Sequence, residues 1–147
     1  MSKIGCASIT WPNLNTTEAI EHMLAEVAAC GYDGVETGSN ALELMKDPDT
    51  LKRRHLRLVG VHCGGDFRQI EDAVLRETYL DITRRAKFFG AEFVFISGAN
   101  YPRKNADDYH IDAHKYNVIG QAVKDAGLML CYHNHHFEFK KNRLGLN

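Results

Sequence analysis

Hydrophobic positions along the chain follow two alternating patterns: short continuous apolar runs, and longer stretches with helical spacing. Three segments share the same order of parts. An amphipathic stretch ends at a glycine, a short apolar run follows, and polar or small residues come last. The glycines suit the left-handed position that ends a helix, and continuous apolar strands are typical of a parallel sheet buried on both faces. The segments are AACGYDGVETG (28–38), KFFGAEFVFISG (87–98) and KDAGLMLCYHNH (124–135).

The stretches between the apolar runs predict helices. Ile20, Met23, Leu24 and Val27 share one helical face at spacings of three and four residues. The pattern predicts helices over 18–30, part of 40–55 with an interruption near Pro48, 70–89 and 106–126, and strands near 3–9, 33–37, 57–63, 92–97 and 128–133. Such alternation predicts a parallel sheet with right-handed crossovers.

Two architectures fit this order: an open doubly wound sheet and a (β/α)8 barrel. A doubly wound dinucleotide fold often carries a glycine-rich loop after its first strand. Here the first strand is followed by TWPNLNTT, and the pair Gly64-Gly65 lacks GxGxxG spacing. Five strands in 147 residues correspond to the number of residues per strand in an eight-stranded barrel of about 250 residues. We therefore predict an α/β fold, a (β/α)8 TIM barrel-like chain truncated to about five β/α units.

Composition excludes several classes of function. Hydrophobic residues make up 44% of the chain, enough for a core, and the formal net charge is -1. The chain has no excess of basic residues that would indicate a nucleic-acid partner. It also has no basic amphipathic segment that would indicate a membrane partner. The first residues lack the pattern of a secretory signal, so a cytoplasmic location is expected. The four cysteines form no CxxC pair, and buried free thiols are expected for those in predicted strands: Cys6, Cys63 and Cys131.

Side chains capable of chemistry follow several predicted strands. In a (β/α) barrel the functional residues gather where strands end. Glu36 could bind a substrate hydroxyl or cap the next helix, and His62 could act in catalysis or be a satisfied core histidine. Trp11 could form a wall for a sugar ring or pack at the rim. Further polar residues at strand ends are Ser97, Asn100, Asn134 and His135.

The densest cluster is CYHNHHFEF at 131–139, with three histidines and one glutamate within 133–138. His133 and His135 point to the same side of a strand, because side chains alternate with a period of two. Imidazole and carboxylate together suit a divalent metal such as Mn²⁺, Co²⁺, Fe²⁺ or Zn²⁺. The alternative is a solvated polar loop.

Three segments carry a family resemblance. GYDGVE at 31–36, ITWPN at 9–13 and YHNHHFEF at 132–139 resemble the sugar phosphate isomerase/epimerase group of xylose isomerase-like TIM barrels, and inosose dehydratases in particular. The resemblance implies that residues 1–147 are the N-terminal part of one such barrel domain. It also implies one divalent metal, held by Glu, Asp, His and Glu side chains from strands five to eight.

The chain departs from the family pattern in two ways. Many relatives carry a glutamate where this chain has His133, so either His133 replaces that ligand or Glu138 supplies it; we favour Glu138, because carboxylate suits a hard ion. Strands six to eight are absent from the sequence. We therefore expect a truncated product, a fragment or a half-barrel completed by a partner, with weak metal binding at best.

The resemblance implies a sugar or cyclitol isomerase, epimerase or dehydratase that abstracts a proton next to a carbonyl. We predict that Glu36, His62 and His135 are catalytic, that Trp11, Asn134 and Asn100 bind substrate, and that Glu138 and His133 hold the metal. The chain alone is expected to be nearly inactive.

Two alternatives are a non-catalytic half-barrel that binds a sugar or a partner chain, and an endonuclease IV-like phosphodiester hydrolase. The near-neutral charge argues against the hydrolase. Open sheet edges also predict self-association as a homo-oligomer.

Overall fold

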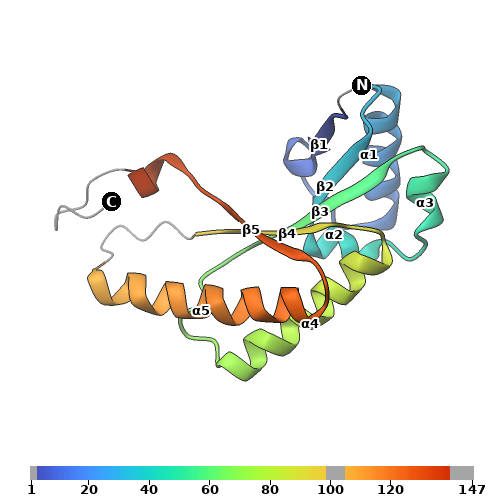
Figure 1. Ribbon diagram of the computed structural model, residues 1–147. Coiled ribbons are helices and arrows are strands. Elements are labelled where there is room, and N and C mark those ends of the chain that lie inside the picture. Colours follow the sequence, from blue (N-terminus) through green and yellow to red (C-terminus); the bar gives the residue numbers. More distant parts are fainter. Residues whose placement is uncertain (1–2, 99–104, 140–147) are drawn as a thin grey trace.

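The computed structural model describes residues 3–98 and 105–139, which form a curved sheet with helices packed on one side (Figure 1). Its five strands run in chain order β1-β2-β3-β4-β5, and all neighbouring pairs are parallel. This confirms the predicted order. The strands are β1 (Gly5–Ala7), β2 (Gly34–Gly38), β3 (Arg57–Gly64), β4 (Phe93–Ser97) and β5 (Met129–His133).

Helices connect successive strands close to the predicted bounds. Thr16 caps the first helix, because its side chain accepts a hydrogen bond of 3.1 Å from the backbone N–H of Ala19. The predicted helix over 40–55 is two short helices separated around Pro48, as the interruption indicated. The helices are α1 (Thr17–Ala29), α2 (Ser39–Leu44), α3 (Asp49–Lys52), α4 (Asp72–Phe88) and α5 (Ala106–Asp125), with 3-10 turns η1 (Ser8–Thr10) and η2 (His136–Phe139).

The core lies between the helices and one face of the sheet. Along β4, Val94 and Ile96 are buried, whereas Phe93, Phe95 and Ser97 alternate with them and are half-buried. Alternate residues of a strand point to opposite faces, so the first pair faces the helices and the other three face away. The buried side chains that complete this core include Ile20, Met23, Leu24, Val35, Leu58, Leu75 and Ile119.

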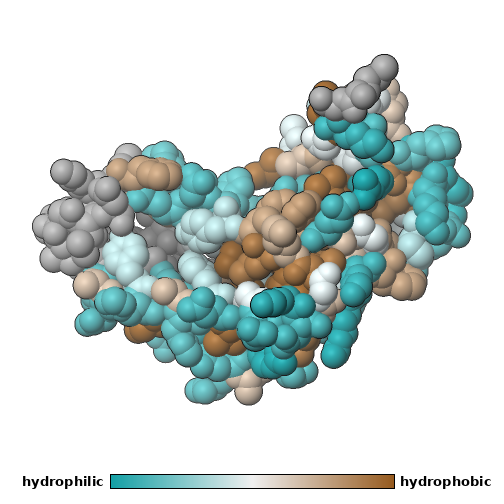
Figure 2. Space-filling view, viewed as in Figure 1, coloured by the Kyte–Doolittle hydropathy of each residue, from teal (hydrophilic) through white to brown (hydrophobic). Residues whose placement is uncertain are grey.

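The other face of the sheet lacks a covering layer among the described residues. Figure 2 shows this side as a hollow with apolar side chains near its centre. Phe93 and Phe95 pack together there, with ring centroids 5.9 Å apart. In a closed barrel this face would line the interior. The structure is thus an open barrel segment of five β/α units, as predicted.

The cysteines in the strands differ in burial according to the strand that carries them. All four cysteines are free; Cys63 is buried, but Cys6 and Cys131 are only half-buried and Cys30 is exposed. The expectation of buried strand thiols is therefore correct for Cys63 and wrong for the other two, because both lie on the edge strands of an open sheet. No helix in the described part of the chain is both long and apolar enough to cross a membrane.

Candidate functional site

Three polar side chains from adjacent strands form one hydrogen-bonded chain on the open face. The imidazole Nδ1 of His62 lies 3.2 Å from Oε1 of Glu36, and its Nε2 lies 3.1 Å from Oγ of Ser97. Because an ionised carboxylate only accepts, Nδ1 must carry the proton if it bonds to Glu36, which leaves Nε2 to accept from the serine hydroxyl. The carboxylate thus fixes the tautomer of the imidazole.

The sheet register explains how these residues meet. Glu36 pairs with Gly60, two residues before His62, and Ser97 pairs with Gly64, two residues after it. A shift of two residues keeps side chains on the same face, and such diagonal neighbours are within reach of long side chains. The three polar groups therefore rise in steps along neighbouring strands, toward the carboxyl ends. They are only partly shielded: the side chains of Glu36 and His62 are 27% and 28% exposed.

Aromatic rings extend this site onto β5. The ring of His133, which pairs in register with Ser97, lies 5.1 Å from the ring of His62. The ring of His135 lies 4.9 Å from that of His133 and stacks on Phe137 at 4.9 Å. The Nδ1 atom of His135 is buried and has no hydrogen-bond partner within 3–98 and 105–139. Glu36, His62 and His133 thus lie together at the carboxyl ends of β2, β3 and β5.

Glu138, the favoured metal ligand, makes two hydrogen bonds within its own loop, and its role as a ligand stays a prediction. One carboxylate oxygen accepts a hydrogen bond from the Tyr132 hydroxyl, and the other accepts from the backbone N–H of His135. Both oxygens are therefore used to close the loop between β5 and η2. Among the described residues, no group of three or more His, Cys, Asp or Glu side chains is arranged to hold a metal ion.

Tyr132 links this loop to the neighbouring helix. Its ring lies 5.5 Å from that of Tyr116 on α5. Burial, together with the hydrogen bond to the Glu138 carboxylate, raises the pKa of Tyr132 far above that of a free tyrosine. Burial also raises the pKa of Tyr116. Both phenols are hence neutral near pH 7, and Tyr132 remains a hydrogen-bond donor to Glu138.

The three residues predicted to bind substrate lie in different places. The indole N–H of Trp11 donates to Glu26 on α1 at 2.5 Å, so its polar atom is directed to a helix rather than to the His62 contacts. Asn134 is exposed and directly follows His133 in the chain. Asn100 lies outside the described residues. Their substrate-binding roles stay predictions.

Ser97 and Tyr132 are the residues whose contacts sequence reasoning missed. The position of Ser97 at the end of a predicted strand was visible, but its partner was not, because the register between β3 and β4 determines which residue it meets. Tyr132 sits inside the motif at 132–139, yet its bond to Glu138 depends on the turn η2, which has no periodic signal in the sequence.

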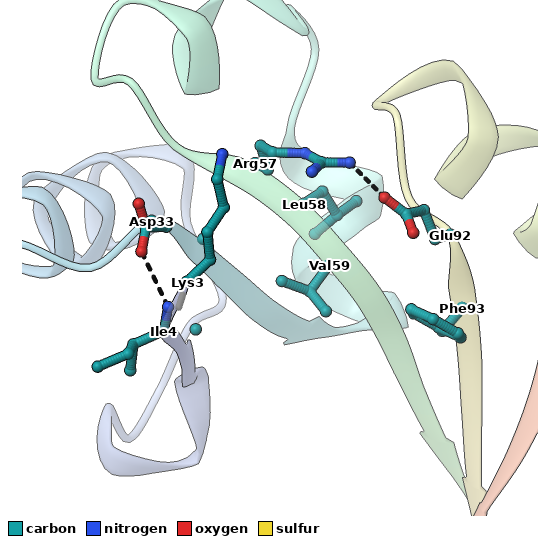
Figure 3. A pocket seen from close by; sticks show the side chains of 10 residues that line it. Lys3, Ile4, Asp33, Arg57, Leu58, Val59, Glu92 and Phe93 are labelled. Carbon is teal, nitrogen blue, oxygen red and sulfur yellow. Dashed lines mark hydrogen bonds and ion pairs between the residues drawn. The ribbon is translucent and has the colours of Figure 1, made fainter. Parts of the chain in front are cut away.

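A hollow of about 250 Å³ lies at the opposite edge, where strands β1 to β4 begin (Figure 3). Its charged walls are partly neutralised by pairing: Arg57 forms an ion pair with Glu92, and Asp33 accepts a hydrogen bond of 2.8 Å from the backbone N–H of Ile4. It contains none of the imidazoles. The histidines of the candidate site lie instead at the carboxyl ends of the strands.

Comparison with known proteins gives the fold a family context. The chain has a TM-score of 0.68 to a sugar phosphate isomerase/epimerase from Parabacteroides distasonis ATCC 8503, with 19% identity over 95% of this chain and 53% of that one. It has a TM-score of 0.70 to an L-ribulose 3-epimerase, with 20% identity over 90% and 49%. A probable 3-DHS dehydratase from Bacillus anthracis gives 0.69, with 11% identity over 89% and 52%.

The fold is that of the sugar phosphate isomerase/epimerase barrels. The chain spans about half the length of these solved structures. No family model matches the sequence, and no curated protein matches it. The fold resemblance expected from the sequence motifs is therefore confirmed by structure. That residues 1–147 make up the N-terminal part of a single domain stays a prediction.

Proposed function

We propose that this chain carries part of the site of a sugar or cyclitol isomerase, epimerase or dehydratase that moves a proton next to a carbonyl. The observation that carries the proposal is the imidazole of His62, held by Glu36 at the carboxyl ends of the strands. Polyhydroxy ketones are the substrate class, in keeping with the fold and with the epimerases and dehydratase of similar structure. The carboxyl ends of barrel strands are where such chemistry is found.

His62 is the proposed base. Its Nε2 takes a proton from the carbon next to the carbonyl, the C–H electrons move into the carbonyl, and an enediolate forms. Glu36 stabilises the imidazolium that results, as a carboxylate does for a catalytic histidine. Return of the proton to the other face gives the epimer, return to the neighbouring carbon gives the isomer, and loss of a β-hydroxyl as water gives the dehydrated product. His135, two residues beyond His133, is a second proposed acid–base group.

The divalent metal implied by the resemblance does not fit the described residues as a complete site. Both oxygens of Glu138 accept hydrogen bonds within the loop. His133 would offer a single imidazole, whereas tight sites use three or four protein ligands. The proposed proton transfer therefore rests on protein acid–base groups, with His62 and Glu36 as the base pair, and we expect any metal contribution here to be weak.

Exchange of substrate protons with solvent tests the proposal. The chain is incubated in D₂O with a ketohexose or a 2-keto-inositol, with and without Mn²⁺, and loss of the α-proton signal is followed by NMR. We expect slow exchange, because a site open to water stabilises an enediolate poorly. The exchange should fall on the order of 100-fold in His62→Gln, the size of a general-base contribution.

A matched control separates this site from general imidazole catalysis. His110 lies exposed on α5, and His110→Gln should leave exchange unchanged. Ring-proton shifts of His62 and His133 during the ketose titration report binding independently. Binding without exchange would identify the non-catalytic half-barrel instead, and exchange that survives in His62→Gln would contradict the proposed base.

A further inference from the structure

The order of groups around His62 resembles that of an activated serine nucleophile. A carboxylate contacts one imidazole nitrogen at 3.2 Å, and a serine hydroxyl contacts the other at 3.1 Å. Nucleophile and base pairs in enzymes lie within about 2.6–3.2 Å, with the base oriented by a third group. We propose that Ser97 is a nucleophile and that Glu36, His62 and Ser97 together hydrolyse small acyl esters, an activity separate from the proposed sugar chemistry.

The surroundings of Ser97 leave its hydroxyl open to a small substrate. Ser97 is half-buried at the end of β4 on the uncovered face. Its partner across the sheet is Gly64, where an added Cβ would lie 3.2 Å from the Ser97 hydroxyl oxygen. On the other side its register partner is His133, whose ring lies 5.1 Å from that of His62. The absence of a side chain at Gly64 therefore leaves access, while the two rings limit the acyl group to a short one.

The reaction follows from the hydrogen-bonded order. The Ser97 oxygen attacks the carbonyl carbon of the ester while its proton passes to Nε2 of His62, and Glu36 balances the charge on the imidazolium. Collapse of the tetrahedral intermediate breaks the bond to the alcohol, which leaves with the proton from His62. Water then attacks the acyl-serine, His62 takes the water's proton and returns it to the Ser97 oxygen, and the carboxylic acid is released. No oxidant, reductant or metal is needed.

The test uses p-nitrophenyl acetate as the probe. Release of p-nitrophenol measures turnover, and intact-protein mass spectrometry followed by peptide mapping shows where an acetyl group is held. We expect an acetyl group on the peptide that contains Ser97. Hydrolysis should fall roughly tenfold or more in Ser97→Ala and in His62→Gln, because each removes one member of the nucleophile–base pair. Gly64→Ala should slow acetylation, because the added Cβ would lie 3.2 Å from the Ser97 hydroxyl oxygen and crowd it.

Ser8 provides the matched control. It also follows a strand of the same sheet, but its hydroxyl bonds to Thr37 at 3.3 Å and not to an imidazole, so Ser8→Ala should keep full activity. Peptide mapping of the unaltered chain needs no variant and so remains decisive if Ser97→Ala folds poorly. Acetylation of lysines alone, or unchanged hydrolysis in a folded Ser97→Ala, would overturn the proposal. Neither result bears on proton exchange in ketoses, so the two proposals fail separately.

Discussion

The hydroxyl of Tyr132 donates a hydrogen bond to the carboxylate of Glu138, six positions later in the chain. The second carboxylate oxygen accepts from the backbone N–H of His135. The acidic residue that the motif offers as a metal ligand is thus the closing element of a turn. This relationship changes what is expected of the 133–138 cluster.

We predict that Mn²⁺ and Zn²⁺ bind the chain weakly, without a stoichiometric step in calorimetry. A complete site would need three or four ligands, and the Glu138 carboxylate is already held by two hydrogen bonds within its own loop. Glu138→Ala should lower the free energy of unfolding by about 1 kcal/mol, the size of a typical net hydrogen bond, while Glu77→Ala on the exposed face of α4 should not. Tight binding that is lost in both Glu138→Ala and His133→Ala would show instead a complete site.

Close strand packing predicts that replacing Gly60 destabilises the fold. A Cβ at Gly60 would lie 2.7 Å from the backbone carbonyl oxygen of Phe93, closer than real Cβ contacts allow. Gly60→Ala should therefore lower the free energy of unfolding by about 1–3 kcal/mol, as overpacking does. Gly38 has no atom within 4 Å of its added Cβ, so Gly38→Ala is the control and should be nearly neutral. Urea unfolding measures both; equal stability of the two variants would contradict the packing argument.

Burial of a thiol predicts that stability falls at alkaline pH. Burial raises the pKa of Cys63 to about 11 from 9.0, partly offset by hydrogen bonds with Ser39 and Tyr79. Above about pH 9 the unfolded chain loses this proton while the folded chain keeps it, so stability drops as pH rises. The loss should be on the order of 1 kcal/mol between about pH 8 and about pH 10.

Two cysteine variants isolate that contribution. Cys63→Ala should flatten the alkaline decline in urea unfolding free energy, apart from the part due to buried tyrosines such as Tyr79, whose pKa burial also raises. Cys30→Ala, at an exposed thiol, should leave the decline unchanged. An identical pH dependence in Cys63→Ala and the unaltered chain would show that the Cys63 thiol is not protected by folding.

The sequence predicts the strand order and most helix bounds because each depends on local signals. Apolar runs and the glycines after helices act within a few residues of the element they form or end. The hydrogen bonds of His62 are different. They depend on a register shift between Val35 and Glu36 and on the pairing of Gly64 with Ser97. Registers arise from packing across the whole sheet, which no local pattern in one sequence contains.

The contacts within the 131–139 motif could likewise be predicted only in part from the sequence. The sequence correctly places His133 at a strand end beside the other polar groups. It does not reveal that Glu138 turns back to Tyr132, since this depends on a four-residue 3-10 turn that has no periodic signal in the sequence. A motif rich in metal-binding residue types can therefore fold so that its carboxylate is already satisfied.

The uncovered sheet face predicts that the 147-residue chain is a poor monomer. Met129 is 61% exposed, and Phe93, its register partner on β4, and Phe95 are only half-buried. Within the described residues, β1 and β5 are the edge strands, and the outer backbone groups of such strands can pair with another chain. At about 25 cal/mol per Å² of apolar surface, covering this face is strongly favourable.

We expect dimers or larger species in sedimentation analysis, binding of the dye ANS and a broad thermal transition. Met129→Lys, which places a charge on the edge strand β5, should reduce association without touching the buried core. A monodisperse monomer that melts sharply and does not bind ANS would mean that this face is covered in solution.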